Sequence, residues 1–473
     1  VTEAALLDVV VEITVAMPRY RTYLAPGHVS AEDRVVVKTV TQAALDAGCD
    51  PEAVKITRDV LLHDVDQPGA AEWVVAWQQF TPAVAAKGVE DTALYRYHAH
   101  EALNVVGGDP DVVPSDPVGR FHRYCEERAG RPSRAGLNAT STHDTKRSED
   151  VRCRIDVLSE LSHSWPRLLR RFSRLTAVHR RDLGDRVAPD RVDESLVYQV
   201  LLGAWPLSGD ELPEFRDRLA AYLVKAARES KRHTSWLDPD ESYEAALTNF
   251  AAGLFEDQEF RAAFEPLQRK VASAGAVNSL AEVVCKVAAP GAPDVYQGTE
   301  LWDLSLVDPD NRRRVDLDHR VRLLAQLDAE EREAGGERLA RRLLGEWHDG
   351  AVKLFVLSRA MRARRERPEI FVTGRYSPLR ASGRRSDHVV AFARAASDGA
   401  TAVTVVPRLV ARWTGPGRLP VGRWWATTAV ELPEDGPTEW VDALTGRRVR
   451  SVDGRIALAD LLRNLPVAIA LSE

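Results

Sequence analysis

Apolar residues recur with the period of a helix along most of the chain and change to short β-rich runs near its end. Apolar positions 6, 7, 10, 11 and 13 predict a helix that starts almost at the first residue. The helical period then dominates 1–130, 145–280 and 351–366, with helices also reaching about 345. The stretches "APGHVSAED", "GGDPDVVPSDP", "GAWPLSG" and "TSWLDPDESY" are typical of the loops that separate such helices.

Two short stretches between the helical blocks predict isolated strands. Residues 134–142, "RAGLNATST", suit a buried strand of small residues that ends in polar ones. The stretch "LAEVVCKVAAPGAPDVYQGTELW" runs from a helix into a short apolar strand and then a Gly- and Pro-rich loop. Long helical blocks around isolated strands, each followed by a loop, indicate part of a parallel α/β assembly, in which the loops after the strands carry the chemistry.

The last hundred residues have a different pattern. Short β-rich runs such as "HVVAFARAA", "ATAVTVVPRLV", "RWWATTAVEL" and "PVAIALSE" alternate with Gly, Pro, Asp and Asn turns. This spacing predicts an antiparallel β-sandwich.

Composition narrows the class of protein. A chain of 473 residues exceeds what one hydrophobic core supports, so two or three domains are expected. With a net charge of −6, we expect neither nucleic acid nor an anionic membrane as a partner. No apolar stretch approaches the roughly 20 residues of a membrane span, and the first residues lack the features of a signal peptide. The four cysteines form no CxxC pair, which favours reduced thiols in a cytoplasmic protein over a zinc site or a disulfide scaffold.

The pair His143-Asp144 is the main candidate for chemistry. His63-Asp64 and His348-Asp349 also occur, and we interpret those two as solvated or helix-capping. His143-Asp144 differs because it follows a predicted buried strand, which would direct Asp144 into the mouth of a barrel. Ser141 is too close along the same strand end to form a hydrolytic triad with the pair. A purely structural role for Asp144, as N-cap of the following helix, remains an alternative.

Several stretches carry a resemblance to a known family. "NATSTHDTKRSEDVR" resembles the fourth signature region of the α-amylase superfamily, in the form found in maltooligosyl trehalose synthases. "AAPGAPDVYQGTELWDLSLVDPDNRRRVD" is similar to that family's segment after the eighth barrel strand. "FTPAVAAKGVEDTALYRYHAHEALNVVGGDP", "ARESKRHTSWLDPDESYE" and "RERPEIFVTGRYSPL" fit the same family. The matches run from about residue 10 to the end of the chain.

The resemblance implies roles for individual residues. Asp144 would be the catalytic carboxylate that stabilises the transition state through the sugar's 2- and 3-hydroxyls, and His143 would donate to the same hydroxyls. The further residues implied to bind substrate are Lys87, Glu90, Asp91, Tyr95, Arg96 and Arg147. Tyr95 or Tyr97 could stack on a sugar face. For the "KGVEDTALYRY" stretch, a helix start with exposed charges and a buried tyrosine remains an alternative.

Two other groups of residues have open interpretations. Asp294, Gln297 and Glu300 either support the rim of the barrel or bind distant glucose units. Trp424 and Trp425 either form a sugar-stacking platform or belong to the core of the sandwich or a domain seam.

Three signatures of the superfamily are missing upstream of His143. The nucleophilic Asp of a "GxRxDH" strand end, the general-acid Glu of the next strand and the earlier "DxxxNH" region do not occur there. We therefore expect the chain to correspond to the C-terminal portion of such a synthase, lacking the N-terminal part of the catalytic barrel. A chain that begins with Val1 fits this expectation of a fragment.

The resemblance and the pattern together give an expected fold of class α/β. It comprises the latter part of a (β/α)8 TIM-type barrel with large helical insertions, followed by a C-terminal antiparallel β-sandwich. The expected segments are 1–130, a helical segment with barrel helices; 131–345, the last barrel strands with a helical insertion; and 346–473, the sandwich.

The function that the resemblance implies is that of an isomerase, a (1→4)-α-glucan 1-α-glucosylmutase. It would turn the reducing-end α-1,4 bond of a maltodextrin into an α,α-1,1 bond, and this chain alone would be inactive. The alternatives are a non-catalytic maltodextrin-binding remnant and a related α-glucan hydrolase or 4-α-glucanotransferase. The expected partners are maltooligosaccharides and a trehalose-releasing hydrolase that acts on the product, with no cofactor and no metal.

Overall fold

The computed structural model describes residues 1–473 except 109, 111–113, 132–135, 309, 414–417 and 434–435. The chain divides into two compact units. Unit 1 comprises residues 1–97 and 228–237, and unit 2 comprises residues 98–227 and 238–473. The segment boundaries expected at 130 and 345 stay a prediction.

Both units contain many α-helices. The α-helices are α1 Glu3–Val15, α2 Ala31–Asp46, α3 Pro51–Leu61, α4 Ala70–Val84, α5 Pro117–Gly130, α6 Glu149–Ile155, α7 Trp165–Leu175, α8 Arg191–Ala204, α9 Leu212–Ser230, α10 Glu241–Glu256, α11 Gln258–Ala288, α12 Leu317–Ala334, α13 Gly336–Gly345, α14 Ala351–Glu366, α15 Pro368–Phe371 and α16 Leu458–Leu461. The described interruptions around 205–208 and 231–240 fall where the Pro-containing stretches predict them.

The strands are short and lie in four sheets. They are β1 Leu137–Asn138, β2 Arg181–Asp182, β3 Val187–Ala188, β4 Ala292–Pro293, β5 Arg375–Leu379, β6 Ala381–Ser382, β7 Val389–Ala395, β8 Thr401–Pro407, β9 Ala429–Glu431, β10 Glu439–Asp442, β11 Arg448–Arg450, β12 Arg455–Ala457 and β13 Ala468–Ser472. The pairs β1-β4 and β2-β3 form two small sheets; the other nine strands form one sheet of six and one of three.

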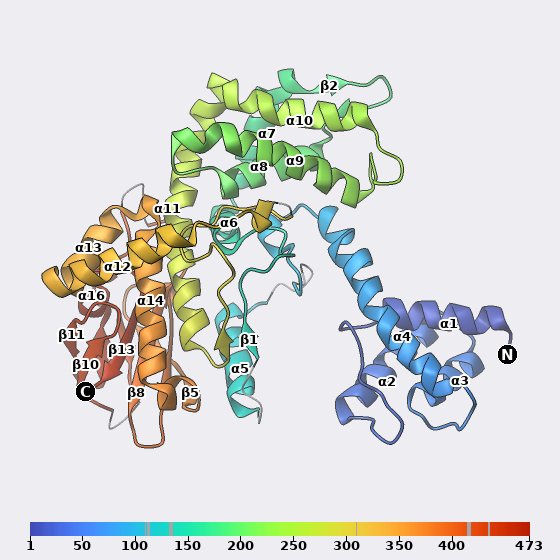
Figure 1. The fold of residues 1–473 in the computed structure, drawn as a ribbon, viewed down its shortest axis with the longest axis horizontal. Coiled ribbons are helices and arrows are strands. Elements are labelled where there is room, and N and C mark those ends of the chain that lie inside the picture. The colour runs from blue at the N-terminus through green and yellow to red at the C-terminus, as the bar shows by residue number, and fades with distance from the viewer. Residues whose placement is uncertain (109, 111–113, 132–135, 309, 414–417, 434–435) are drawn as a thin grey trace. The chain divides into compact units, whose positions relative to one another are not determined.

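Unit 1 is built on the helices α1 to α4 (Figure 1). Thr2, Ser30 and Asp50 cap the first three of these helices by accepting backbone N–H groups in the first turn. The helix α1 begins where the pattern predicts, but its buried face is centred on Val9 and Ile13, while two apolar positions of the predicted face, 7 and 11, are exposed. The helical period of the apolar residues therefore predicted the helix correctly but its buried face only in part.

The longest helix, α11, passes through the core of unit 2. By length and composition alone it could cross a membrane, contrary to the expectation that no stretch comes near that length. However, 83% of its most apolar window is buried inside the protein, as in the core helix of a soluble fold. Its apolar surface is thus accounted for by packing.

The C-terminal residues form two antiparallel sheets, as the sequence predicts. The six-stranded sheet has the order β11-β10-β13-β8-β7-β5, and the three-stranded sheet has the order β12-β9-β6. A shared apolar core contains Val403 and Val405 from the larger sheet and Val430 and Ile456 from the smaller one. The two sheets thus bury one face of each against the other.

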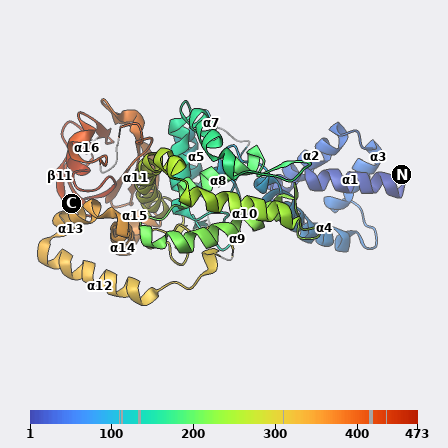
Figure 2. The ribbon, with the colours of Figure 1, turned by 90° about the horizontal axis from the view of Figure 1, so that it is seen from above.

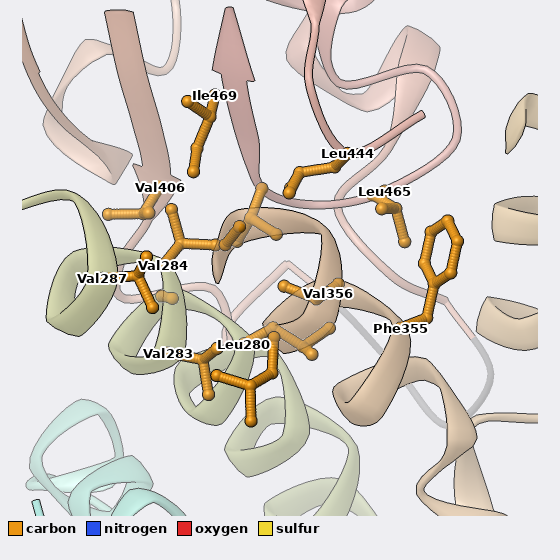
Figure 3. Packing of buried hydrophobic residues seen from close by; sticks show 14 of the residues in the cluster. Leu280, Val283, Val284, Val287, Phe355, Val356, Val406, Leu444, Leu465 and Ile469 are labelled. Carbon is orange, nitrogen blue, oxygen red and sulfur yellow. The ribbon is translucent and has the colours of Figure 1, made fainter. Parts of the chain in front are cut away.

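A second apolar core joins the six-stranded sheet to the helices. Figure 3 shows Val283, Val284 and Val287 of α11 close to Val356 of α14 and Ile469 of β13. The helix α12 lies at the edge of the unit and is followed by α13, as Figure 2 shows. Because α11 and α14 share this core with the sheet, the β-rich segment does not pack independently of the helices before it.

Candidate functional site

The candidate site is built on two loops that follow paired parallel strands. Strand β1 pairs with β4 in the registers Leu137–Ala292 and Asn138–Pro293. Since the strands run in the same direction, the loops after them leave the same edge of the sheet. The first loop, 139–148, carries His143 and Asp144; the second, of residues 294–308 and 310–311, is called the β4 loop below.

The strand predicted over 134–142 is shorter than expected. Residues 132–135 lie outside the described part of the chain. Of residues 136–142, only Leu137–Asn138 is strand. The following hydroxyl side chains turn back toward α6: the Ser141 hydroxyl accepts the backbone N–H of Glu149 at 2.8 Å. Bonding between this loop and the start of α6 thus replaces the strand ladder.

Backbone hydrogen bonds lock the two loops together. The N–H of Ser148 donates to the carbonyl of Ser305 at 3.0 Å, and the N–H of Val307 donates to the carbonyl of Lys146 at 3.1 Å. The side-chain amide of Asn311 donates to the carbonyls of Thr142, at 3.3 Å, and His143, at 3.1 Å. The β4 loop therefore positions the peptide that carries the His-Asp pair.

Asp144 is half-buried at a turn, and His143 beside it is exposed. The backbone N–H of Asp144 donates to the Thr142 hydroxyl at 3.2 Å. Among the described residues, no hydrogen bond or ion pair engages the Asp144 carboxylate. Ser148, not Asp144, occupies the N-cap of α6, so the capping alternative for Asp144 is wrong.

A polar cavity of about 380 Å³ lies against the β4 loop. Asp303, Asp310 and Asn311 line it, together with Trp302 and Arg313. Asn311 connects the cavity to the peptide of His143 through the hydrogen bond described above. The cavity combines an indole with carboxylate, amide and guanidinium groups, a mixture that suits a ligand rich in hydroxyls.

A buried cluster of charges, here called the lysine–carboxylate cluster, holds the start of α6. It consists of Glu149, Asp150, Lys286 and Lys353, all almost fully buried. The Lys353 ammonium lies 2.7 Å from Glu149 and 2.8 Å from Asp150, and Lys286 lies 3.1 Å from Glu149. Two cations balance two anions, which is the condition under which buried charges are tolerated.

This cluster reaches both loops. Lys286 donates to the hydroxyl of Thr140 at 2.8 Å, and the carboxylate of Asp150 accepts the backbone N–H of Asp303 at 2.7 Å. Burial alone would raise the pKa of Glu149, but the neighbouring Lys353 and Lys286 outweigh burial and lower it to about 2. Burial raises the pKa of Asp303. The charges thus clamp the two loops onto α11 and α14.

Arg147 belongs to a second buried group. Its guanidinium pairs with Glu101 and donates to the Tyr222 hydroxyl at 2.8 Å, and His98 lies 2.5 Å from Glu101. Burial opposes the ionised form of Glu101, but Arg147 and the hydrogen bond from His98 lower its pKa. These contacts hold the loop that carries Arg147, and that Arg147 also binds substrate stays a prediction.

The other sequence-derived candidates lie in unit 1. Lys87 is exposed and pairs with Asp91 at 2.5 Å, while Glu90 is buried and accepts a hydrogen bond from Tyr20. Tyr95 is buried, and Arg96 donates to the carbonyl of Ser230 at 2.5 Å. Lys87 and Glu90 belong to the short π-helix Ala85–Glu90, and Tyr95 belongs to the 3₁₀ helix Ala93–Tyr95. That they share a pocket with Asp144 stays a prediction.

The structure bears on three of the residues with open interpretations: Glu300, Trp424 and Trp425. The carboxylate of Glu300 accepts from Gly298 at 3.1 Å and from Arg320 at 3.0 Å, which is loop support. Trp425 is fully buried and donates to the carbonyl of Pro420 at 2.9 Å, so it is a core residue, whereas Trp424 is half-buried. The carboxylate of Asp349 accepts the N–H of Ala351, the first residue of α14, while Gly350 occupies the N-cap of that helix.

The buried lysines of the cluster were missed from the sequence. Lys353 stands in the apolar run "AVKLFVL" and Lys286 in "VVCKVAA", and each is the only charge in its run. A lone lysine in an apolar helical stretch signals a buried partner, since an unpaired buried ammonium costs several kcal/mol. The identity of that partner is not visible in the local sequence.

Glu282, next to this cluster, gives a pH-dependent prediction. Its Oε1 is inaccessible and has no hydrogen-bond partner among the described residues, and its Oε2 accepts the thiol of Cys153 at 3.2 Å. Burial raises its pKa to about 7, with Arg152 opposing and Glu149 adding to the shift. The folded protein therefore holds a proton that the unfolded chain releases near pH 4.5.

The free energy of unfolding should consequently include a contribution that is complete below pH 4.5 and is lost as the pH rises through about 7. Glu282→Gln is expected to remove this decline. Urea unfolding of parent and variant between pH 4.5 and pH 8 measures it, as the difference between the two curves. If the free energies of unfolding of parent and variant changed with pH in the same way over this range, the raised pKa of Glu282 would be contradicted.

No family model matches the chain. Two curated proteins from Mycobacterium tuberculosis, of the strains CDC 1551 and H37Rv, are 35% identical to it over 402 residues. Both carry the name of maltooligosyl trehalose synthase. The match covers 85% of this chain and 46% of each of these proteins.

Solved structures agree. The structure of maltooligosyltrehalose synthase from Arthrobacter ramosus is 35% identical, with a TM-score of 0.77, and the match covers 99% of this chain and 54% of that one. A hypothetical maltooligosyl trehalose synthase from Sulfolobus tokodaii is 26% identical, with a TM-score of 0.69, over 98% of this chain and 53% of that one. The chain thus spans about half the length of the relatives it matches.

Proposed function

We propose that this chain, which resembles maltooligosyl trehalose synthases over most of its length, supplies part of the glucan site of such an isomerase. The substrate would be a maltooligosaccharide whose reducing-end α-1,4 bond becomes an α,α-1,1 bond. The observation that carries the proposal is the position of Asp144. Its unengaged carboxylate stands on the loop after a parallel strand, and that loop is locked to the cavity-lining β4 loop.

The chemistry assigns a defined role to Asp144. Retaining glycosyl transfer needs a nucleophilic carboxylate and a general acid, about 5–5.5 Å apart, on either side of the scissile bond. A third carboxylate that binds the 2- and 3-hydroxyls acts most strongly as the ring flattens toward an oxocarbenium ion, because those hydrogen bonds strengthen in the transition state. Asp144 would provide that contact, with His143 donating to the same hydroxyls.

Isomerisation also requires that the released glucose stays bound. The freed sugar must turn and attack through its own anomeric hydroxyl before water does, so positioning and exclusion of water decide the outcome. Lys87, Glu90, Asp91, Tyr95 and Arg96 are the residues we propose for this pocket. Their role rests on the resemblance of the "KGVEDTALYRY" segment.

The same proposal extends to the barrel strands, the enzyme that uses the product and the cellular compartment. The parallel pair β1-β4 would be the last two strands of a (β/α)8 barrel, since each strand is followed by a loop and a helix of unit 2. The product would be consumed by a hydrolase that releases trehalose. A cytoplasmic setting fits the four cysteines, all of which are free thiols.

Product analysis tests the proposal. The 473-residue chain is incubated with maltopentaose alone and after joining or mixing with the half of the Arthrobacter enzyme that it does not match. We expect the chain alone to bind without turnover, because Asp144 is the only one of the three catalytic acids assigned to it. The assembly should lose reducing ends without releasing glucose.

Three other outcomes would each contradict part of the proposal. Release of reducing sugar by the assembly would favour an α-glucan hydrolase or transferase. A non-reducing product from the chain alone would overturn our assignment of the catalytic acids. Neither binding nor turnover in any combination would refute the proposed function.

A further inference from the structure

A cluster of aromatic and cationic side chains lies on the C-terminal sheets, away from the two loops of the candidate site in sequence. It consists of Arg385 and His388, between β6 and β7, Trp413 after β8, and Trp424 before β9. Three separate segments of the chain bring these residues together. We call them the Trp413 cluster.

Trp413 is held in position although it is exposed. Its indole N–H donates to Nε2 of His388 at 3.0 Å, and Nδ1 of His388 lies 3.3 Å from the carbonyl of Arg408. The two contacts together require a neutral imidazole with its proton on Nδ1. With its N–H engaged, Trp413 is still 53% exposed.

Arg385 spans both indoles. Its guanidinium carbon lies 5.1 Å from the ring centre of Trp413 and 4.0 Å from that of Trp424, within the range of a cation–π contact. Among the described residues, no carboxylate comes within salt-bridge distance of Arg385. Its backbone is tied down through the N–H, which donates to the Thr428 hydroxyl at 3.0 Å.

A role in the core does not explain this arrangement. The adjacent Trp425 shows what a core tryptophan looks like here: it is fully buried, and its N–H has a backbone acceptor. Trp413 instead presents a fixed apolar ring to solvent beside a planar group of N–H donors. A flat ring matches the C–H face of a pyranose, and guanidinium N–H groups match its hydroxyls.

We propose that the Trp413 cluster is an accessory binding site for a neutral α-1,4-linked glucose chain. Trp413 stacks on one glucose unit, and Arg385 donates to the hydroxyls of that unit or the next. The inference rests on the proposed function for its choice of ligand, because a maltodextrin is long enough to present many equivalent units. The Trp413 cluster would add a contact with the glucan that takes no part in the transfer of glycosidic bonds.

Affinity electrophoresis of the full chain in gels containing amylopectin tests the site. Trp413→Ala should raise the dissociation constant for the polysaccharide by about tenfold, the upper range of one lost stacking contact. Trp413→Phe should retain part of the affinity, because it keeps a flat ring. Tyr23→Ala is the matched control: Tyr23 is 66% exposed and lies 4.8 Å below Arg21, but without a second ring.

The result that would overturn the inference is equal retardation of parent and Trp413→Ala in native gels, with unchanged thermal unfolding. Retardation that disappears at about 0.5 M NaCl and is stronger on dextran sulfate would also overturn it, since screening marks a charged ligand. Turnover of maltopentaose by the assembly should be unchanged in Trp413→Ala. If turnover is absent throughout but Trp413-dependent retardation remains, the proposed function fails and the accessory site stands.

Discussion

Asp144→Asn is expected to reduce turnover of maltopentaose by a factor on the order of 10³ or more, with the fold unchanged. The substitution keeps the shape of the side chain but removes the charge that would bind the sugar hydroxyls in the transition state. Charge-assisted hydrogen bonds of this kind contribute several kcal/mol, of which each 1.4 kcal/mol or so is a factor of ten in rate. Because the Asp144 carboxylate has no partner among the described residues, no ion pair is lost with the charge.

The measurement uses the assembly of this chain with the unmatched half of the Arthrobacter enzyme. Initial rates of loss of reducing ends are compared for parent, Asp144→Asn and the control Asp156→Asn. The Asp156 side chain is half exposed, and the only described partner of its carboxylate is His100, at 3.4 Å. Near-parental turnover in Asp144→Asn, with the control also active, would remove Asp144 from the mechanism.

Much of the local structure could be predicted from the sequence because it depends on neighbours along the chain. The helix α14, Ala351–Glu366, matches the residues expected for it, and the C-terminal strands fall on the β-rich runs. Asp144 could be singled out because a strand of small residues followed by polar ones marks a loop at a strand end. The identity of the strand's partner, β4, depends on residues about 155 positions further on.

The rest could not be predicted because it depends on pairs of residues far apart in the sequence. Lys353 and Asp150 are 203 residues apart, and nothing in either local pattern indicates the other. The contact of Arg147 with Tyr222 could not be predicted for the same reason, since Tyr222 lies on α9, 75 residues further along the chain. The face of α1 could not be fixed either, because apolar residues occur on more than one side of that helix.

The dependence of the site on these distant pairs leads to the second large effect. Lys353→Met is expected to lower the free energy of unfolding of unit 2 by about 3–5 kcal/mol, or to prevent folding. The Lys353 side chain is fully buried, and its ammonium lies between Glu149 and Asp150. Methionine fills the space but leaves two buried carboxylates with one lysine, Lys286, which forms an ion pair with Glu149 and none with Asp150 among the described residues.

Urea unfolding monitored by tryptophan fluorescence measures the effect. Lys225→Met is the matched control, because its ammonium lies 3.7 Å from Asp308 at a partly exposed position, where an ion pair contributes no more than about 1 kcal/mol. The double variant Lys353→Met/Asp150→Asn should recover part of the loss, since it removes the carboxylate left without a cation.

Recovery of stability in the double variant would distinguish an effect of unbalanced charge from an effect of altered packing. If the loss came only from the altered shape of the side chain, the second substitution would add to the damage, because Asp150 also accepts the N–H of Asp303 in the β4 loop. A single variant within about 1 kcal/mol of the parent would show that the buried ion pairs are neutral for stability. With recovery in the double variant, the charges of α6, α11 and α14 would be established as the support that holds the Asp144 loop.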